Sequence, residues 1–576
     1  MSKEFASSMA YEEKVPDRAK FDDYESKTSD SSEAKYRAFE NWLLVNGAEF
    51  PDVVLKSYSD NVRGVHTRTD VPPHMCIISI PLKCLITDLM GRTQTEAGRM
   101  VFAPNVNANL SAPTLIAVVL FILENQRDPK CFFKPYFDVL PNDWSDFPIF
   151  WSDENLHSWL KGSPLIRDVK DRIRSMRADY EEVRRICGAA VFPYSFDEFL
   201  KVRTAVGSRN FGIIVDGEKR TSMVPFADML NHFRPRETSW TFDSSRGHFT
   251  ITTLTRLSAG QQVMDSYGRK DNSRFLLHYG FAVEVNREED GRCQNELALS
   301  LRIGGYRENY PSSASSCTSD TSSSSSSSSS GSSSTAISPA YGATMAAPAL
   351  VRNIHGTQLQ GTNSFGSSTH VVSVETEDDD DESAHHTQVD SLGPMKRALL
   401  GAGKTKRQFK ISMNREDKGT GDAIAFARIL AANEDELVQL MARSNQSSTS
   451  LFATKFLSPK NEAAALQILA DACRAQLTRY ERSYEENLAL LQSNALRQFS
   501  PRRAALVVIV GEQEICSYWI HAARVLSEGL LTGKEALMRL SSVAPGEPSF
   551  WTRDVARHAG WLVSAWNDSQ RGKRSF

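Results

Sequence analysis

Hydrophobic positions in this chain repeat at two different periods, and the period changes several times along the sequence. Residues 34–45 place Phe39, Trp42 and Leu43 at helical spacing, and Gly47 follows just past the end as a cap. This segment is the first ordered element that the pattern predicts. We interpret it as a packing helix that carries no chemistry.

Short β-rich runs come next. Residues 61–70 and 75–81 are two such runs, and Pro72-Pro73-His74 between them is typical of a turn. Further along, residues 250–254 are rich in strand-forming residues, and residues 295–301 are strand-like. The pattern therefore predicts several short strands that are far apart in the sequence.

Helical periodicity fills the long intervals between and after these strands. Residues 93–206 carry it first, with a single apolar face that includes Leu115, Val119 and Ile122. It returns later, and the predicted helices there span 423–440, 461–477, 484–496 and part of 529–576. The last of these regions is expected to pack as a small helical tail.

Two segments lack the apolar residues that folding requires. Residues 1–33 are polar and acidic, and residues 305–403 contain the unbroken serine run 322–330 and the acidic run 375–382. Such compositions cannot bury enough apolar surface to offset the entropy of ordering the chain. Both segments are predicted to be disordered.

Composition and charge exclude several classes of function. The chain has 576 residues and a formal net charge of -3, so no basic excess favours a nucleic-acid partner. Its 8 cysteines are scattered without metal-ligand spacing, so we expect reduced thiols and no metal site. No signal, transit or transmembrane segment is evident, which predicts a cytoplasmic or nuclear protein without membrane contact.

The stretch 226–281 resembles the C-terminal half of a SET domain. It opens with Phe-Ala-Asp-Met-Leu-Asn-His at 226–232, and about 35 residues later it continues with Asp-Ser-Tyr-Gly at 265–268 and Tyr-Gly-Phe at 279–281. In SET domains these segments thread into a knot-like core that holds S-adenosylmethionine beside a lysine channel. The run 61–70 likewise resembles the family's entry strands.

Other segments are similar to the subgroup of the Rubisco large-subunit lysine methyltransferase and the actin-histidine methyltransferase. The similar segments are Lys134–Pro141, Thr95–Arg99, the helices from Asn461 and Tyr484, and 502–515. The resemblance implies an α+β protein, with a knotted β-rich SET domain at 34–300 and its helical insert at about 93–206. An all-helical substrate-binding domain at 405–528 and a tail at 529–576 would follow the disordered insert.

The resemblance also implies roles for individual residues. Tyr267 matches the SET tyrosine that orients the amine, and it is the predicted catalytic residue. The residues expected to bind the cofactor are Gly64, Glu96, Ala97, Gly98, Arg209, Asn231, His232, Tyr279, Gly280 and Phe281. Phe211, Tyr267 and Tyr279 are expected to line the substrate channel.

The implied reaction is methyl transfer from S-adenosylmethionine to a lysine of a non-histone protein. A free lysine has a pKa near 10.4, so making it neutral at pH 7 costs about 4.6 kcal/mol unless the site helps. Members that act on histidine carry an asparagine two residues after the matched arginine, where this chain has the apolar Phe211. Lysine is therefore favoured as the target residue. The protein is also expected to be a monomer.

Two alternatives stay open at this point. One is methylation of a histidine, and the other is a catalytically silent SET-type module that binds a partner protein. Tyr267, Asn231 and Arg209 are all present, which argues against the silent module.

Overall fold

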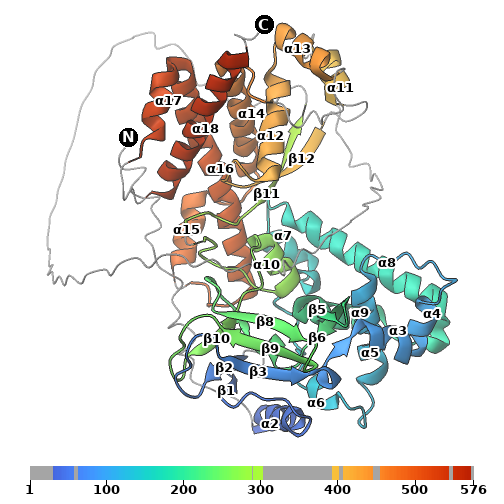
Figure 1. The fold of residues 1–576 in the computed structure, drawn as a ribbon. Helices are drawn as coiled ribbons and strands as arrows, with labels where there is room; N and C mark the ends of the chain where they lie inside the picture. Colours follow the sequence, from blue (N-terminus) through green and yellow to red (C-terminus); the bar gives the residue numbers. More distant parts are fainter. Residues whose placement is uncertain are drawn as a thin grey trace, which may run out of the picture. The chain divides into compact units, whose positions relative to one another are not determined.

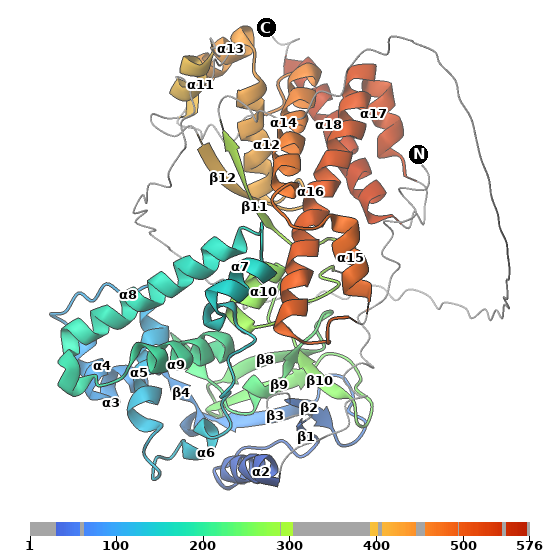
Figure 2. The ribbon, with the colours of Figure 1, turned by 180° about the vertical axis from the view of Figure 1, so that it is seen from behind.

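The computed structural model describes residues 30–57, 63–288, 290–302, 392–400, 406–444, 455–493, 495–543 and 549–572. The predicted disorder of residues 1–29 and of most of the insert falls outside these ranges. Figures 1 and 2 show the β-strands of the N-terminal region and the long helices of the C-terminal region from two opposite sides.

Three small sheets form the β-rich part. The order is β1-β2-β10-β7 in the first, β3-β9-β8 in the second and β4-β6-β5 in the third. Their strands are β1 Val53–Ser57, β2 Arg63–Thr67, β3 Cys76–Pro81, β4 Ile86–Thr87, β5 Asn210–Val215, β6 Glu218–Met223, β7 Asn231–His232, β8 Thr238–Asp243, β9 His248–Thr253 and β10 Gln262–Asp265. Neighbouring strands thus come from distant parts of the sequence, as the scattered β-rich runs predict.

Nine helices lie before, between and after these strands in the described part of this region. They are α2 Asp30–Val45, α3 Asp88–Gln94, α4 Glu96–Val101, α5 Pro113–Asn125, α6 Lys134–Phe137, α7 Asp153–Trp159, α8 Leu165–Val191, α9 Phe196–Arg209 and α10 Asn272–Tyr279. Of these, α3 and α5 pack on β6. The predicted first helix is confirmed, although α2 begins at Asp30 rather than at residue 34. Residues 115–123 of α5 are all buried, so this helix lies inside the core rather than on its surface.

The C-terminal region is helical apart from one pair of strands. Its elements are β11 Leu297–Arg302, α11 Gly393–Leu400, β12 Lys406–Ile411, α12 Lys418–Ala431, α13 Glu434–Ser444, α14 Pro459–Leu477, α15 Tyr484–Gln492, α16 Pro501–Thr532, α17 Lys534–Ser541 and α18 Phe550–Gly572. Inside it, Arg428 and Glu462 form a buried two-pronged ion pair at 2.6 and 2.8 Å, which joins α12 to α14.

Three predicted boundaries are wrong. Strand β11 pairs along its whole length with β12 and contributes Leu299 to the helical core, so it does not end the SET region. Helix α11 lies within the predicted disordered insert, and its Leu400 is buried in the same core. Helix α16 runs unbroken through residue 528, and α18 packs into that core, so the tail is part of the helical domain. In each case apolar side chains continue the core past a break in the sequence pattern.

A polar contact joins the helical insert to α16. The buried carboxylate of Glu512 accepts hydrogen bonds from the Ser163 hydroxyl at 2.8 Å and from the Tyr480 hydroxyl at 2.9 Å. Burial raises the pKa of Glu512 to about 8. Close to this contact, Gln476 donates a hydrogen bond to the carbonyl of Gly162 at 2.8 Å.

No helix among the described residues is both long and apolar enough to cross a membrane.

A pair of deletions tests where the helical domain begins. Removing 310–390 is expected to leave the fold intact, because the segment is polar and loop closure costs little extra free energy as a loop changes length. Removing 310–400 also deletes Leu399 and Leu400, each 4% exposed. That second deletion should lower the free energy of unfolding by about 3–5 kcal/mol, from the burial of two leucines. Urea unfolding followed by tryptophan fluorescence measures both, and equal stability would contradict the assignment of α11 to the core.

Candidate functional site

The site forms where β7 runs parallel to β10. In this short ladder Asn231 lies opposite Met264, and His232 lies opposite Asp265. Strand β10 also pairs with β2, which carries Gly64. The preceding Phe226 has a φ of 72°, a left-handed conformation that a bulky residue adopts only when its surroundings hold it there.

The side chain of Asn231 ties these three strands together. Its Nδ2 donates to the carbonyl of Arg63 on β2 and to Oε1 of Gln262 on β10, both at 2.8 Å. Both amide hydrogens are therefore used within the protein. Asn231 thus acts on the site by fixing the strands around it.

Tyr267 is held at both its backbone and its side chain. Its N–H donates to Nδ1 of His232 at 3.0 Å, and its hydroxyl donates to the carbonyl of Leu230 at 2.7 Å. Burial raises the pKa of Tyr267, and the nearby Arg209 charge offsets only part of that effect. The hydroxyl therefore stays protonated and can orient a ligand without acting as a base.

An aromatic cluster surrounds this tyrosine. The rings of His232 and Tyr279 both stack on the ring of Tyr267, with centroids 5.1 and 5.2 Å from its centroid. Helix α10 ends at Gly280, whose left-handed φ of 78° lets the chain reverse. Phe281 then folds back and stacks on Phe275 at 5.1 Å.

Beside the cluster lies a polar group made of Arg63, Arg209 and the carboxylate of Asp228, which we call the arginine pair. Arg209 donates through Nη1 to the carbonyl of Asp228 at 2.8 Å and lies 3.4 Å from its carboxylate. Tyr136 donates to the same carboxylate at 2.9 Å. Arg63 is buried close enough that Arg209 contributes to lowering its pKa, after burial as the main cause.

The arginine pair carries one positive charge in excess and several unused polar atoms. Nη2 of Arg63, Nε of Arg209 and Oδ1 of Asp228 are buried without a hydrogen-bond partner among the described atoms. An unpaired buried donor costs about 1–3 kcal/mol. A ligand with a carboxylate and an ammonium group would satisfy all three, so the residues present fit the amino-acid end of such a ligand.

The structure brings together most of the predicted site. Asn231 and His232 contact the elements that hold Gly64 and Tyr267, and Tyr279, Gly280 and Phe281 close the aromatic cluster. The cofactor roles predicted for these residues remain predictions.

Glu96, Ala97 and Gly98 lie on α4, whose described contacts are with α3, α5 and α8. A Cβ at Gly98 would come within 1.8 Å of the carbonyl of Gly91, so close helix packing by itself requires this glycine. Phe211 packs edge-on against Trp240 and Phe249, with ring centroids 5.5 and 5.1 Å away. The observed ring contacts of Phe211 are thus with the sheet core.

Sequence reasoning missed Arg63, Asp228 and Gln262. Arg63 directly precedes Gly64, and Asp228 lies three residues before Asn231 within the same motif. Their position beside predicted site residues was the available signal. Their hydrogen bonds with the predicted site residues Arg209 and Asn231 span 19 to 168 residues, which no local pattern reports.

The buried imidazole of His232 predicts a pH dependence of stability. Burial, with help from Arg234 and Lys270, lowers the pKa of His232 to about 3. In the unfolded chain the imidazole takes up a proton near pH 6.5, so the folded state loses stability as the pH falls from 6.5 toward 3.

Between pH 6.5 and pH 5 this loss should amount to about 2 kcal/mol, at 1.36 kcal/mol per pH unit. Urea unfolding at several pH values measures the total pH dependence, and His232→Gln should reduce it by this amount, while His278 and His558, whose pKa values burial also lowers, keep their own contributions. If the free energy of unfolding changes with pH equally in wild type and variant, the imidazole of His232 is not buried in its neutral form.

Comparison with known proteins agrees with both parts of the fold. Residues 387–515 match the family described as Rubisco LSMT substrate-binding. The solved structure "Crystal structure of the SET domain of LSMT bound to Lysine and AdoHcy" matches with a TM-score of 0.58 at 16% identity, covering 89% of this chain and 97% of that one. "Structure of Rubisco LSMT bound to AdoMet" matches with a TM-score of 0.56 at 16% identity, over 89% and 97% of the two chains.

The curated relatives that match are named for methylation of a histidine in actin. The actin-histidine N-methyltransferase of Homo sapiens is 23% identical over 274 residues, which is 46% of this chain and 45% of that protein. The Xenopus tropicalis protein of the same name is 24% identical over 46% of each chain. This chain thus spans about half the length of the curated relatives it matches. It combines the fold of the Rubisco LSMT SET structures with a Rubisco LSMT substrate-binding domain.

Proposed function

We propose that this chain is an S-adenosylmethionine-dependent methyltransferase that acts on a lysine side chain of a protein. The observation that carries the proposal is the fixed position of Tyr267, with its hydroxyl bonded to the Leu230 carbonyl and its backbone bonded to His232. A residue held at both ends cannot swing away, so its hydroxyl oxygen offers a constant acceptor to a substrate amine. The cofactor would supply a methyl group activated on a sulfonium.

The residues around Tyr267 favour an uncharged amine. His232 is neutral at physiological pH, and burial raises the pKa of Tyr279 to about 12, so both rings remain uncharged. Arg209 contributes a nearby positive charge, and a positive charge disfavours protonation of a neighbouring amine. Together, desolvation and this charge act in the direction that reduces the cost of a neutral lysine.

The arginine pair suits the cofactor's amino-acid end. Arg63 and Arg209 would bind its carboxylate, and Oδ1 of Asp228 would accept from its ammonium. Asn231 holds β2 against β7 and β10, which keeps Arg63 near Arg209. The matched solved structures are of LSMT bound to AdoHcy or AdoMet, which supports this choice of ligand.

The nature of the target rests on two observations that point in different directions. Solved LSMT structures contain bound lysine or methyllysine, and Phe211 gives this chain an apolar residue where a histidine-directed member has asparagine. The curated relatives are named for histidine methylation of actin. We favour lysine, with the domain at 387–515 as the region that binds the substrate protein.

Replacing Tyr267 with phenylalanine tests the catalytic assignment. Tyr267→Phe should lower the methyl-transfer rate at least a hundredfold, the usual size of losing one positioned catalytic group, while cofactor affinity stays within a factor of about two. Single-turnover transfer from labelled cofactor to lysate proteins measures the rate, and calorimetry measures the affinity. Mass spectrometry of the labelled peptides separates methyllysine from methylhistidine.

Tyr180→Phe is the matched control, because the Tyr180 hydroxyl also donates to a carbonyl, that of Tyr194 at 2.9 Å. It should leave the rate unchanged. A Tyr267→Phe enzyme that keeps its full rate would exclude the tyrosine from the mechanism. If the wild type binds cofactor but transfers no methyl group to any protein, the silent binding module is the correct reading.

Replacing Asn231 with alanine tests the cofactor region. The change removes the two bonds that join β2 to β7 and β10, so S-adenosylmethionine binding should weaken at least tenfold, or about 1.4 kcal/mol. Asn487→Ala is matched in chemistry, because Asn487 Nδ2 also donates to a glutamine Oε1 (that of Gln513, 2.9 Å) and to an arginine carbonyl (that of Arg482, 3.5 Å). This control should bind the cofactor as wild type does, and equal affinity in both variants would contradict the assignment.

A further inference from the structure

A small polar cavity lies in the helical domain, lined by residues outside the candidate site. It has a volume of about 40 Å³ and is lined by Arg292, Met413, Asn414, Arg415, Glu416, Tyr518, Asp554, Arg557, His558 and Trp561. On the same scale one water needs roughly 10–15 Å³, so a few oxygen-sized atoms can enter. Nothing in the proposed methyl transfer uses these residues.

His558 is the most unusual residue of this cavity. Its side chain is 3% exposed, and neither Nδ1 nor Nε2 has a hydrogen-bond partner among the described atoms. Buried histidines ordinarily satisfy at least one ring nitrogen, because an unpaired polar atom costs about 1–3 kcal/mol. The rings of Trp519 and Trp561 pack against the imidazole, with centroids 5.7 and 6.5 Å away, and so hold it in place in the cavity lining.

Arg415 supplies a positive charge to the same space. Its guanidinium lies over the ring of Trp561, and its buried Nε has no hydrogen-bond partner among the described atoms. Burial and the charge of Arg428 lower the pKa of Arg415 to about 9, which still leaves it charged at neutral pH. No described carboxylate forms an ion pair with it.

The other charges of the cavity are balanced. Arg557 pairs with Asp554, and Arg292 lies 3.4 Å from Glu416. Arg428 behind the cavity is paired with Glu462. Among these described cations, Arg415 is thus the one without a carboxylate within ion-pair distance, and water could fill the space but could not supply that charge.

We propose that this cavity binds a small oxyanion, a carboxylate or a phosphate group, between Arg415 and His558. One oxygen would accept from Nε of Arg415 and another from the imidazole, which satisfies donors that the protein itself leaves unpaired. The charge of the ligand would pair with the positive charge of Arg415. The indole of Trp561 holds the guanidinium in place before binding.

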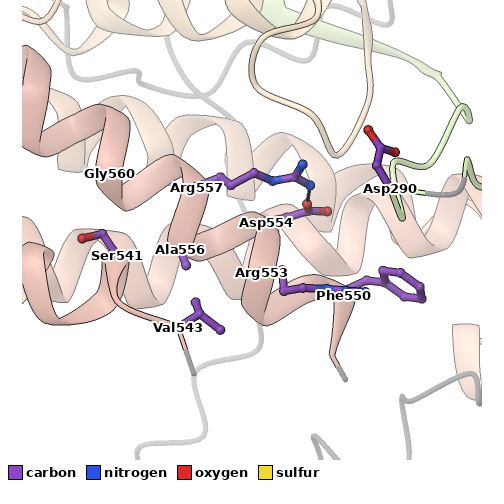
Figure 3. Close-up of a pocket in the computed structure, with 9 residues that line it drawn as sticks. All are labelled: Asp290, Ser541, Val543, Phe550, Arg553, Asp554, Ala556, Arg557 and Gly560. Carbon is purple, nitrogen blue, oxygen red and sulfur yellow. Dashed lines mark hydrogen bonds and ion pairs between the residues drawn. The ribbon is translucent and has the colours of Figure 1, made fainter. Parts of the chain in front are cut away.

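A larger hollow adjoins this cavity and gives a ligand room to approach. It has a volume of about 470 Å³ and shares Asp554 and Arg557 with the smaller cavity. Figure 3 shows both residues on α18, joined by their ion pair, with Asp290 on the facing segment. Arg553 lines only the larger hollow, so it is a suitable control residue on the same helix.

Calorimetric titration of the full chain with inorganic phosphate, and separately with sodium acetate, tests the proposal. We expect saturable binding of at least one of them, with a Kd on the order of 1 mM. Arg415→Met keeps the length of the side chain and removes its charge, so it should weaken binding at least tenfold. Arg553→Met should leave the affinity unchanged.

Hydrogen exchange of the wild type localises the ligand without any substitution. The bound anion should slow exchange in 413–416 and 554–561, and His558→Gln should weaken the effect. The preferred probe distinguishes a phosphate ligand from a carboxylate ligand. Absence of saturable binding up to about 50 mM of either anion, roughly fifty times the expected Kd, overturns the proposal. Binding that Arg415→Met and His558→Gln both leave unchanged, or protection confined to other segments, also overturns it.

Discussion

The candidate site depends on the parallel pairing of β7 with β10, which spans only two residue pairs. A parallel ladder this short is weak, and it needs a long connection between its strands. Here that connection contains β8 and β9, which pair with each other in a different sheet. The side chain of Asn231 adds the bonds to β2 and β10 that so short a ladder lacks. One amide thus holds together strands that carry groups from three regions of the sequence.

Charge is distributed unevenly around these strands. On the side of Tyr267, the imidazole of His232 is neutral and accepts a hydrogen bond in a form that burial keeps unprotonated. On the side of Asp228, the buried Arg63 and the partly buried Arg209 share one carboxylate. An amine and a ligand carboxylate need these opposite conditions. The fold provides them next to each other by placing a stacked aromatic surface beside an incompletely paired ionic group.

The sequence predicts the individual elements better than the contacts between them. The spacing of Phe39, Trp42 and Leu43 was enough to predict α2, because a helix is specified locally. The residues of the aromatic cluster could be predicted because they lie in one motif. By contrast, Tyr136 and Asp228 lie 92 residues apart, and their bond depends on how the helical insert folds back. The cofactor role of Gly98 was inferred from a resemblance of its segment, and the need for a glycine in the packing of α4 against α3 became visible only in the structure.

Strands β11 and β12 lie on either side of the longest segment outside the described residues, yet they pair from Leu297↔Ile411 to Arg302↔Lys406. The two ends of that segment are therefore held together by six residue pairs and by the leucines beneath them. Covalent continuity through the segment adds little to this attachment. The parts of the chain before and after this segment share a sheet through β11 and β12. Two separately synthesised halves, divided within 310–390, therefore have the contacts needed to assemble into one protein.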